Sequence, residues 1–491
     1  MGVSDALRRL LTAFSDAFRG QDELDLTDGG IAKPLFFLSL PIVITNLLQT
    51  AYNLADTFWL AQVNEVALAA ITFGFPMVFL LISLGMGLSV AGSVLVAQHT
   101  GAEEEAEAEY AASQTVMFAL VASTLLGVGG YFLVDDVLWL LGARGDVLRE
   151  ATRYMEVIAL GMPFLFGFFV FIALMRGYGD TVTPMLVMFG TVVLNVVIDP
   201  LFIFGYGPIP DGLGVQGAAI ATVISRFLAT AVGLGIMFSG RKGVEIHLSQ
   251  MAPDLAFFRK MLNIGIPASI EGTGRSISVN LMLVVVAIFS DGFVAAFGVG
   301  IRIFSVIFLP AIAVGQGVET MVGQNIGAGK RDRAGRTAHT AAIGMFGVLS
   351  AAAVVVFVFT EAIVAPLSPN EQVADISVTF LRVVAPTFGF IGVMRAYNGT
   401  FRGSGKTMVS ATIAITMLGV IRLPIAFVLS RSIDPFASMA PYATGQAGIW
   451  ASFVVSNVVG AVIAYAWFRR GTWRHGDVRG NAAPEASATD D

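Results

Sequence analysis

Long apolar segments recur along this chain, and they limit what it can fold into more than any other feature. Runs of about 20 or more mainly apolar residues follow one another between Pro34 and Arg469. A run of this length can cross a hydrocarbon core of about 30 Å as an α-helix, which satisfies its own backbone hydrogen bonds in lipid. Only 13% of the residues are charged, against about 25% in soluble domains. We therefore predict an all-α polytopic membrane protein.

Twelve transmembrane helices are predicted from these runs. Some of them, such as 256–288, are longer than a crossing requires and would tilt or extend past the bilayer. Because twelve is an even number, both ends of the chain lie on the same side of the membrane. In chain order the predicted spans are 34–61, 66–97, 111–141, 153–175, 183–206, 216–239, 256–288, 292–323, 337–367, 378–401, 407–431 and 447–469.

Basic residues determine the predicted orientation. Nineteen Lys and Arg residues fall in the tails and in the loops on the side of the termini, whereas five fall in the opposite loops and span ends. Cytoplasmic loops carry the excess of Lys and Arg, so we expect both termini of a multi-pass cell-membrane protein to be cytoplasmic. The five residues on the opposite side are Arg144, Arg149, Arg153, Arg382 and Arg431.

The two tails are more polar than the body between them. Residues 1–33 form a predicted cytoplasmic tail that lacks the apolar core of a cleavable signal peptide. Within it, residues 4–20 place Leu and Phe on one helical face, which predicts an amphipathic helix on the inner leaflet. A short disordered tail is the alternative. Residues 470–491 form a small, polar C-terminal tail that we expect to be disordered.

The sequence repeats itself at a shift of 226 residues, which places Pro41 on Pro267. Each half contains six spans, so the halves share one topology and should be related by an axis along the membrane normal, with the substrate path between them. We expect an N-lobe at 34–239, a cytoplasmic linker at 240–255 and a C-lobe at 256–469. The longest repeated segments are Val96-x-Gln98-x-x-Gly101-Ala102 with Val322-x-Gln324-x-x-Gly327-Ala328, and Arg176-Gly177-x-Gly179-x-Thr181 with Arg402-Gly403-x-Gly405-x-Thr407.

Two carboxylates lie inside apolar segments of the first half, Asp56 and Asp199. A carboxylate at the centre of a bilayer costs roughly 2.5–3.5 kcal/mol on insertion scales, so it is retained when it is paired, hydrated or functional. Asn195 precedes Asp199 by four residues, which places both on one helix face. The alternative is a buried Asp that only fixes helix packing, or an Asp199 that supports a kink at Pro200. We interpret the pair as an ion or proton site that drives transport.

The repeated segments, together with Pro41, Tyr52 and Asp56 in the first span, resemble the multidrug and toxic compound extrusion (MATE) family over about residues 34–469. The resemblance implies two six-helix lobes around a V-shaped cavity and alternating access. It also implies efflux of bulky, often cationic, amphipathic compounds, driven by inward Na⁺ or H⁺.

The residues of the first half are most similar to the family branch named after DNA-damage-inducible protein F. That resemblance implies a coupling site formed by Asp56, Asn195, Asp199 and Thr222. Another branch relies on carboxylates of the C-lobe, where this chain has Glu271 and Arg275 on span 7 and Arg395 but no acid on span 10. This departure argues against a C-lobe coupling site. Glu271 and Arg275 are four residues apart, so we expect a neutralising pair, with a gate or substrate contact as the alternative.

The chemistry of the four N-lobe residues is compatible with either coupling ion. Carboxylate, amide and hydroxyl oxygens are hard ligands that suit Na⁺, and two neighbouring carboxylates also suit proton exchange. Pro41 removes a helix hydrogen bond, so we expect it to act as a hinge of span 1. Gln49, Tyr52 and Asn53 are expected to lie beside Asp56, in the cavity. Further charges fall in or near spans, and some of these arginines could extend to an interface; they are Arg226, Arg302, Glu319 and Arg422.

We therefore expect a secondary active multidrug efflux transporter in the lipid bilayer. It would export small amphipathic or cationic molecules by antiport with Na⁺ or H⁺. A lipid-linked oligosaccharide flippase of the same superfamily is the alternative. Enzymatic activity is not expected, because the chain has no Cys, four scattered His residues, no H-E-x-x-H motif and no P-loop. We expect no cofactor besides the coupling ion, no nucleic acid partner and a monomer.

Overall fold

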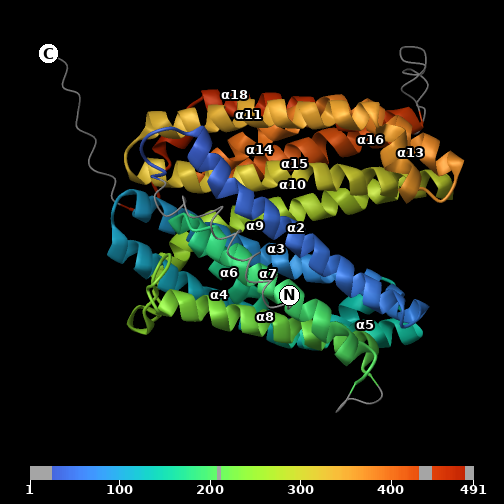
Figure 1. Ribbon diagram of the computed structural model, residues 1–491, viewed down its shortest axis with the longest axis horizontal. Coiled ribbons are helices and arrows are strands. Elements are labelled where there is room, and N and C mark those ends of the chain that lie inside the picture. The colour runs from blue at the N-terminus through green and yellow to red at the C-terminus, as the bar shows by residue number, and fades with distance from the viewer. Residues whose placement is uncertain (1–24, 207–211, 431–444, 481–491) are drawn as a thin grey trace, which may run out of the picture.

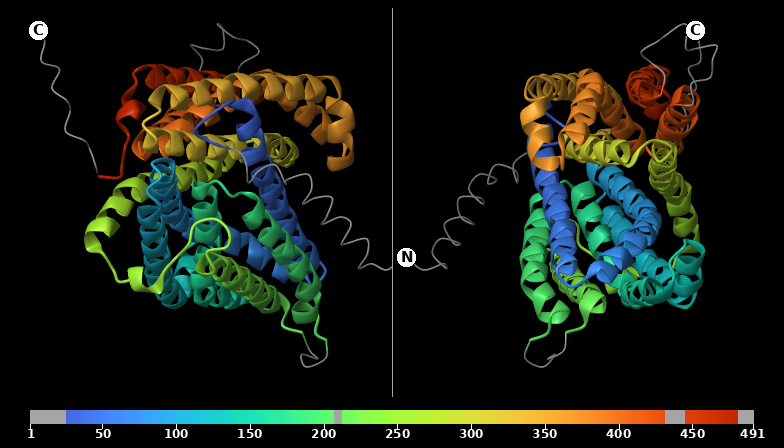
Figure 2. Two further views of the ribbon diagram at one scale, coloured as in Figure 1. Left: turned by 60° about the vertical axis from the view of Figure 1, so that its left-hand side comes forward. Right: turned by 90° about the vertical axis from the view of Figure 1, so that its right-hand side faces the viewer.

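The computed structural model describes residues 25–206, 212–430 and 445–480, which form helices and no β-strand (Figure 1). The helices assemble into two bundles, one from each half of the sequence, and Figure 2 shows the same division from two further directions. The tail 470–491 was expected to be disordered, but its described part, 470–480, contains a 3₁₀ turn at Thr472–His475 with Trp473 buried. The amphipathic helix expected at 4–20 and the end of the C-terminal tail, 481–491, lie outside the described residues.

The N-lobe contains the first six predicted spans. Asn64 begins the second of them, because its side chain accepts a hydrogen bond from the backbone of Ala67 and caps the helix. The fourth predicted span, 153–175, is wrong as one helix: it is a pair bent by 56°. The break falls at Gly161, and Pro163 follows in the first turn, where its missing N–H costs nothing. The helices are α2 (Ala32–Ala61), α3 (Glu65–Gly101), α4 (Glu105–Leu140), α5 (Gly145–Leu160), α6 (Met162–Tyr178), α7 (Val182–Ile203) and α8 (Gly214–Phe238).

The C-lobe repeats this arrangement with more interruptions. The span expected at 337–367 breaks at Phe359 and ends in a 3₁₀ turn that contains Pro366. The span expected at 378–401 is divided by a 3₁₀ turn that contains Pro386, because proline cannot donate the next helical hydrogen bond. The helices are α9 (Leu255–Val286), α10 (Asp291–Gly327), α11 (Arg331–Val358), α12 (Thr360–Val364), α13 (Glu371–Val384), α14 (Phe388–Gly403), α15 (Thr407–Ile415), the π-helical segment η4 (Thr416–Arg422), α16 (Leu423–Ser430) and α18 (Gln446–Arg469).

Most of these helices are long and apolar enough to cross a membrane. Ten helical segments of the described chain meet that condition, and α5 with α6 counts as an eleventh when the bent pair is taken as one span. The remaining helix of the predicted twelve is α9, which does not meet it and carries Glu271 and Arg275 on its membrane-spanning part. This span, which carries charged residues, also packs against α3 of the N-lobe.

Two helices cross from one lobe to the other. The first turns of α2 lie against α10 of the C-lobe, with Leu35 and Ser39 beside Gly317, while the rest of α2 runs along the N-lobe (Figure 1). At the repeat-related position, α9 lies against α3 of the N-lobe, and Gly265 faces Gly87 so closely that a Cβ on either would meet the opposite backbone. Small residues at such crossings let two helices approach each other in a bilayer.

Candidate functional site

A cluster of buried polar side chains lies inside the N-lobe where α2, α7 and α8 pack together. Asp56 on α2 is 6% exposed, and Asn195 and Asp199 on α7 are fully buried. Thr222 on α8 and Tyr52 on α2 are also buried. The structure therefore brings together all four residues that were expected to form the coupling site, and we call this group with Tyr52 the N-lobe polar cluster.

Hydrogen bonding orders one side of the cluster. The Nδ2 atom of Asn195 donates to Oδ1 of Asp199 at 2.8 Å, one helical turn apart on the same face of α7. The carboxyl group of Asp56 faces both the carboxyl group of Asp199 and the hydroxyl of Thr222. Two carboxylates in contact repel each other strongly in a low-dielectric interior, so a proton or a cation between them lowers the energy of the site.

The remaining oxygens of the cluster lack partners. Buried polar atoms are nearly always hydrogen-bonded in folded proteins, so several unsatisfied oxygens at one place call for an explanation. A hard monovalent cation or a proton would supply what they lack, and these donor types fit Na⁺ rather than a transition metal. Within the described chain the unpaired atoms are Oδ1 of Asp56, Oδ2 of Asp199, Oδ1 of Asn195, Oγ1 of Thr222 and the hydroxyl oxygen of Tyr52.

Arg226 adjoins the cluster, although from the sequence it was only one of several charges in or near spans and had no expected role at the site. Its guanidinium lies over the ring of Tyr52, 4.5 Å from the centroid, and donates to Oε1 of Gln49 at 2.9 Å. Gln49 in turn donates to Asn53 at 3.0 Å. The available signal was position: Arg226 follows Thr222 by four residues and therefore shares its helix face. With both carboxylates ionised, the two acids and Arg226 leave one negative charge.

Pro41 lies inside α2, far from the cluster along the helix. Asp56 follows Pro41 by fifteen positions, which correspond to about 22 Å of helix. Pro41 separates the turns that contact the C-lobe, at Leu35 and Ser39, from the part that carries Asp56. A change of angle at this proline would therefore move the polar cluster relative to the C-lobe.

The repeat-related place in the C-lobe has a different chemistry. Met282, which matches Asp56, is buried in the apolar core. Arg422, which matches the stretch around Asn195, is buried and donates from Nε to Ser456 and from Nη2 to Asn457, both at 2.8 Å. Its guanidinium also lies 4.1 Å from the ring centroid of Phe453. Neutral groups thus hold a permanent cation at this position.

Glu271 has a different principal partner from the one expected. Its Oε1 lies 4.0 Å from Arg275 but 3.6 Å from Arg402, and its Oε2 accepts a hydrogen bond from Ser410 at 2.8 Å. Arg402 also pairs with Glu319 at 3.1 Å. The expected couple with Arg275 is therefore the longest of these contacts, because helices distant in sequence supply nearer partners.

The two lobes contact each other reciprocally at the end of the helices where the first and last described residues lie, which we call the terminal end. Nε2 of Gln98 in the N-lobe donates to the carbonyl of Gly403 in the C-lobe at 3.1 Å. Nε2 of Gln324 donates to the carbonyl of Gly177 in the N-lobe, also at 3.1 Å. These four residues form two pairs related by the 226-residue shift, so the repeated motifs close this end of the molecule against each other.

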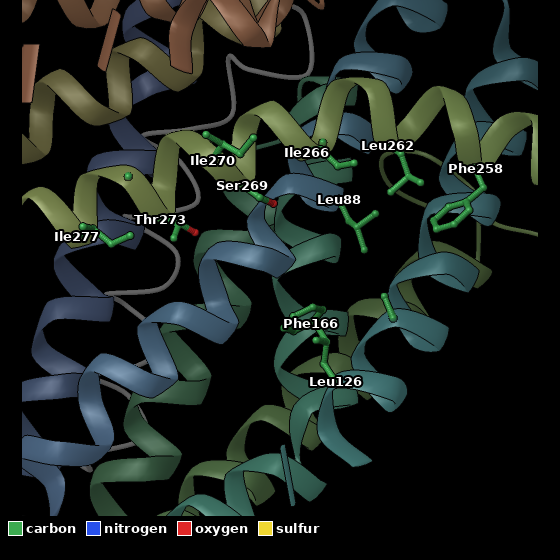
Figure 3. A pocket seen from close by; sticks show the side chains of 13 residues that line it. Leu88, Leu126, Phe166, Phe258, Leu262, Ile266, Ser269, Ile270, Thr273 and Ile277 are labelled. Carbon is green, nitrogen blue, oxygen red and sulfur yellow. The ribbon is translucent and has the colours of Figure 1, made fainter. Parts of the chain in front are cut away.

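An apolar pocket of about 540 Å³ lies at the side of the lobe interface (Figure 3). Phe166 of α6 and Leu88 of α3 line one side, and the pocket-facing residues of α9 line the other, with Ser269 and Thr273 as its polar members. The remaining lining is aliphatic or aromatic. Such a surface binds apolar groups by area and leaves little specificity for their shape.

Comparison with known proteins agrees with this architecture. The MatE family model matches residues 41–201 and 267–428, which make up more than half of the chain and one segment of each lobe. The probable multidrug resistance protein YoeA of Bacillus subtilis is 26% identical, over 88% of this chain and 92% of its own. An FAD transporter of Shewanella oneidensis is 24% identical, over 91% and 96% of the two chains.

Solved structures share the fold over nearly the whole chain. One is described as the outward-facing conformation of a multidrug resistance MATE family transporter of the MOP superfamily. It superposes with a TM-score of 0.83 at 24% identity, covering 91% of this chain and 97% of the solved one.

Proposed function

The chain belongs to the MATE family, and from this premise we propose that it is a secondary active multidrug efflux transporter. It exports amphipathic or cationic organic compounds by antiport with Na⁺ or H⁺ through alternating access. Names of relatives that refer to multidrug resistance support the efflux of drugs. The coupling ion rests on the residues of this chain.

One observation carries the proposal of coupling: Asp56 and Asp199 face each other inside an apolar bundle, surrounded by unpaired oxygens. A carboxylate pair of this kind is costly in a membrane and is retained where it handles ions or protons. Asp56, Asn195, Asp199 and Thr222 would hold the Na⁺, or the two acids would hold the proton. Since Arg226 cancels one of the two negative charges, one monovalent cation makes the site neutral.

The position of Asp56 links ion binding to movement of the lobes. Asp56 lies on α2, and the first turns of the same helix lie against the C-lobe. Neutralising the acids removes their repulsion and lets α2 pack differently against α7 and α8. Pro41 then absorbs the change of angle, as a proline in a transmembrane helix can. In the opposite phase of the transport cycle, the hydrogen bonds that Gln98 and Gln324 donate across the lobe interface would break. The end of the molecule that they close would then open.

The lobe interface supplies the substrate path in this proposal. The apolar pocket beside α9 would accept the hydrophobic part of an amphipathic compound, and the adaptable side chains around it would tolerate many shapes. We propose further that both termini lie in the cytoplasm of a cell-membrane protein, in accordance with the excess of basic residues on that side, and that the single chain is the transporting unit.

Transport into sealed vesicles tests the proposal. Purified protein is reconstituted into liposomes, and accumulation of a cationic dye such as rhodamine 6G is recorded with a Na⁺ gradient, with a pH gradient and with neither. We expect accumulation with at least one gradient, and its loss when Asp56 is replaced by Asn. A dye flux that no gradient changes, in wild type and Asp56→Asn alike, would contradict the proposal.

A lipid-linked oligosaccharide flippase remains the second candidate, because buried and half-buried arginines gather in the C-lobe near the interface. Cationic groups at the lobe interface suit a pyrophosphate headgroup. The same liposomes distinguish the two functions. A flippase would move a fluorescent lipid-linked sugar between leaflets and would leave rhodamine 6G outside, whatever the gradient.

A further inference from the structure

Four arginines and two glutamates form a charged group where the C-lobe meets the N-lobe. The glutamates are Glu271 on α9 and Glu319 on α10, both almost fully buried. The arginines, from α6, α9 and α14, are Arg176, Arg275, Arg395 and Arg402. All six charged residues lie on membrane-spanning helices. The four arginines and two glutamates together leave two positive charges without a negative counterpart.

Three of the arginines have a glutamate partner. Arg402 lies 3.1 Å from Glu319 and 3.6 Å from Glu271, and Arg176 lies 3.8 Å from Glu319. Arg275 reaches Glu271 only at 4.0 Å, and 36% of its side chain is exposed. These contacts use the carboxylates mainly for Arg402 and Arg176, and the pair of Arg176 with Glu319 joins the two lobes.

Arg395 is left without such a partner. Within the described residues it forms no ion pair and donates no hydrogen bond, and its Nε atom is buried and unsatisfied. Its charged neighbours include Arg275 and Arg402, which repel it, and Glu271, which already serves other arginines. An unpaired guanidinium in a transmembrane helix is costly, and coupling at the N-lobe polar cluster gives no reason for it.

We propose that Arg395 and Arg275 form a binding subsite for an oxyanion, a carboxylate or phosphate, on the compound that the protein transports. A guanidinium presents parallel N–H donors that match both oxygens of such a group. Arg275 is exposed enough to be reached, and Arg395 has donors to offer. The subsite rests on the proposed transport function, and it changes the expected substrates: anionic and zwitterionic amphiphiles bind as well as cationic ones.

The apolar pocket lies on another side of α9 from this subsite. Thr273 and Ile277 belong to the pocket lining, whereas Arg275 lies two residues from each, about 200° around the helix, and shares its face with Glu271. The acidic end of a transported compound would therefore bind apart from the pocket, at the arginines themselves.

Binding measured without any gradient tests the subsite. Purified protein in neutral detergent, free of anionic lipid, is titrated with fluorescein as the anionic dye and rhodamine 6G as the cationic one, and fluorescence polarisation reports binding. We expect Arg395→Gln to weaken fluorescein binding by about tenfold or more, which is the range for a hydrogen bond to a charged group. The affinity of Arg395→Lys for fluorescein should lie between those of the wild type and Arg395→Gln. Rhodamine 6G binding should change little in both variants.

Matched variants and competitors complete the design. Arg275→Gln should weaken fluorescein binding as well, which keeps the test valid if one variant folds poorly. Arg382→Gln on α13, an exposed arginine paired with Glu361, removes the same charge elsewhere and should leave both dyes unaffected. Octanoate and octyl phosphate share one apolar chain, so their competition against fluorescein shows whether the carboxylate or the phosphate binds more tightly.

Three results would overturn the subsite: no fluorescein binding by the wild type, equal weakening of both dyes by Arg395→Gln, or an equal effect of Arg382→Gln. Equal weakening would assign Arg395 to the conformational cycle, for example as a partner of Glu271 in the other state. Because no gradient is applied, these results are independent of the vesicle test. Transport of rhodamine 6G that persists while fluorescein fails to bind would reject the subsite and keep the proposed function.

Discussion

The two lobes are built from one repeated sequence, yet they hold positive charge at corresponding places in opposite ways. In the N-lobe, Asp56 and Asp199 face each other with several oxygens unpaired. In the C-lobe, Arg422 occupies the corresponding region and every neighbour that it contacts through hydrogen bonds is neutral. One lobe offers a place for a cation that can leave, and the other contains a cation that is covalently part of the chain.

This difference would explain how a duplicated scaffold has the single coupling site that we propose. In the proposed cycle a mobile ion would change the charge of the N-lobe, whereas the charge of the C-lobe would stay the same. The contacts between the lobes, in contrast, remain symmetric, as the paired Gln98 and Gln324 show. Symmetric contacts suit two alternating closures, and an asymmetric site suits a single driving ion.

The largest effect is expected at Asp199. Replacing Asp199 by Asn removes one of the two charges that would hold the cation, so gradient-driven dye accumulation in liposomes should fall to the level seen without a gradient. Asp375→Asn, an exposed carboxylate on α13 of the C-lobe, is the matched control and should transport like the wild type. Full active transport by Asp199→Asn would remove the basis for the comparison of the lobes.

The second prediction concerns Arg226 and whether its fixed positive charge limits the binding of exchangeable cations at the two carboxylates. Arg226→Gln removes the positive charge beside the two carboxylates. The bound Na⁺ or H⁺ is then no longer repelled by the guanidinium, and a loss of about 1.4 kcal/mol or more of this repulsion should tighten its binding roughly tenfold. Slower release should then reduce turnover. Isothermal titration with NaCl at several pH values gives the affinity. Weaker or unchanged cation binding would show that Arg226 only anchors Tyr52 and Gln49.

Pro41 and its repeat mate Pro267 provide a matched pair of smaller effects. Pro41→Ala restores a helical hydrogen bond between the part of α2 on the C-lobe and the part with Asp56, and should slow transport severalfold without loss of insertion. Pro267→Ala restores the same bond in α9, whose later part carries Met282 instead of an acid, and should slow it less. Initial rates at equal protein density decide this. Equal slowing by the two variants would show that the prolines act through the crossing of α2 and α9 between the lobes, and not through the coupling site.

The smallest effect on coupling is expected at Glu271. Glu271→Gln keeps the shape of the side chain, and Arg402 retains Glu319, so the ratio of transport with and without the ion gradient should stay close to that of the wild type. Overall rate can fall, because a buried pair at the lobe interface is weakened. A coupling ratio of one would transfer the driving site to the C-lobe.

Much of the fold followed from the sequence, because apolar runs and the 226-residue repeat are properties of a single chain. Pro41 with Pro267 and the two glutamine motifs aligned the lobes without a structure. The breaks at Gly161, Phe359 and Pro386 were missed, since an apolar composition continues through each of them.

The sequence identified only part of the candidate site. Asp56 and Asp199 were recognisable because a charge in an apolar run stands out by itself. Arg226 was not, because an arginine near a span end can also reach an interface, and only the packing of α2 against α8 places it over Tyr52. In the same way, Arg402 became the nearest cation to Glu271 through contacts between helices far apart in the sequence.

Cation stoichiometry tests the central claim most directly. Binding of radiolabelled Na⁺ and release of protons are measured together on purified protein across pH, for the wild type, Asp199→Asn and Glu271→Gln. Our account predicts one exchangeable cation per chain in the wild type, none in Asp199→Asn and one in Glu271→Gln. Two cations per chain, or one that survives in Asp199→Asn and disappears in Glu271→Gln, would contradict it.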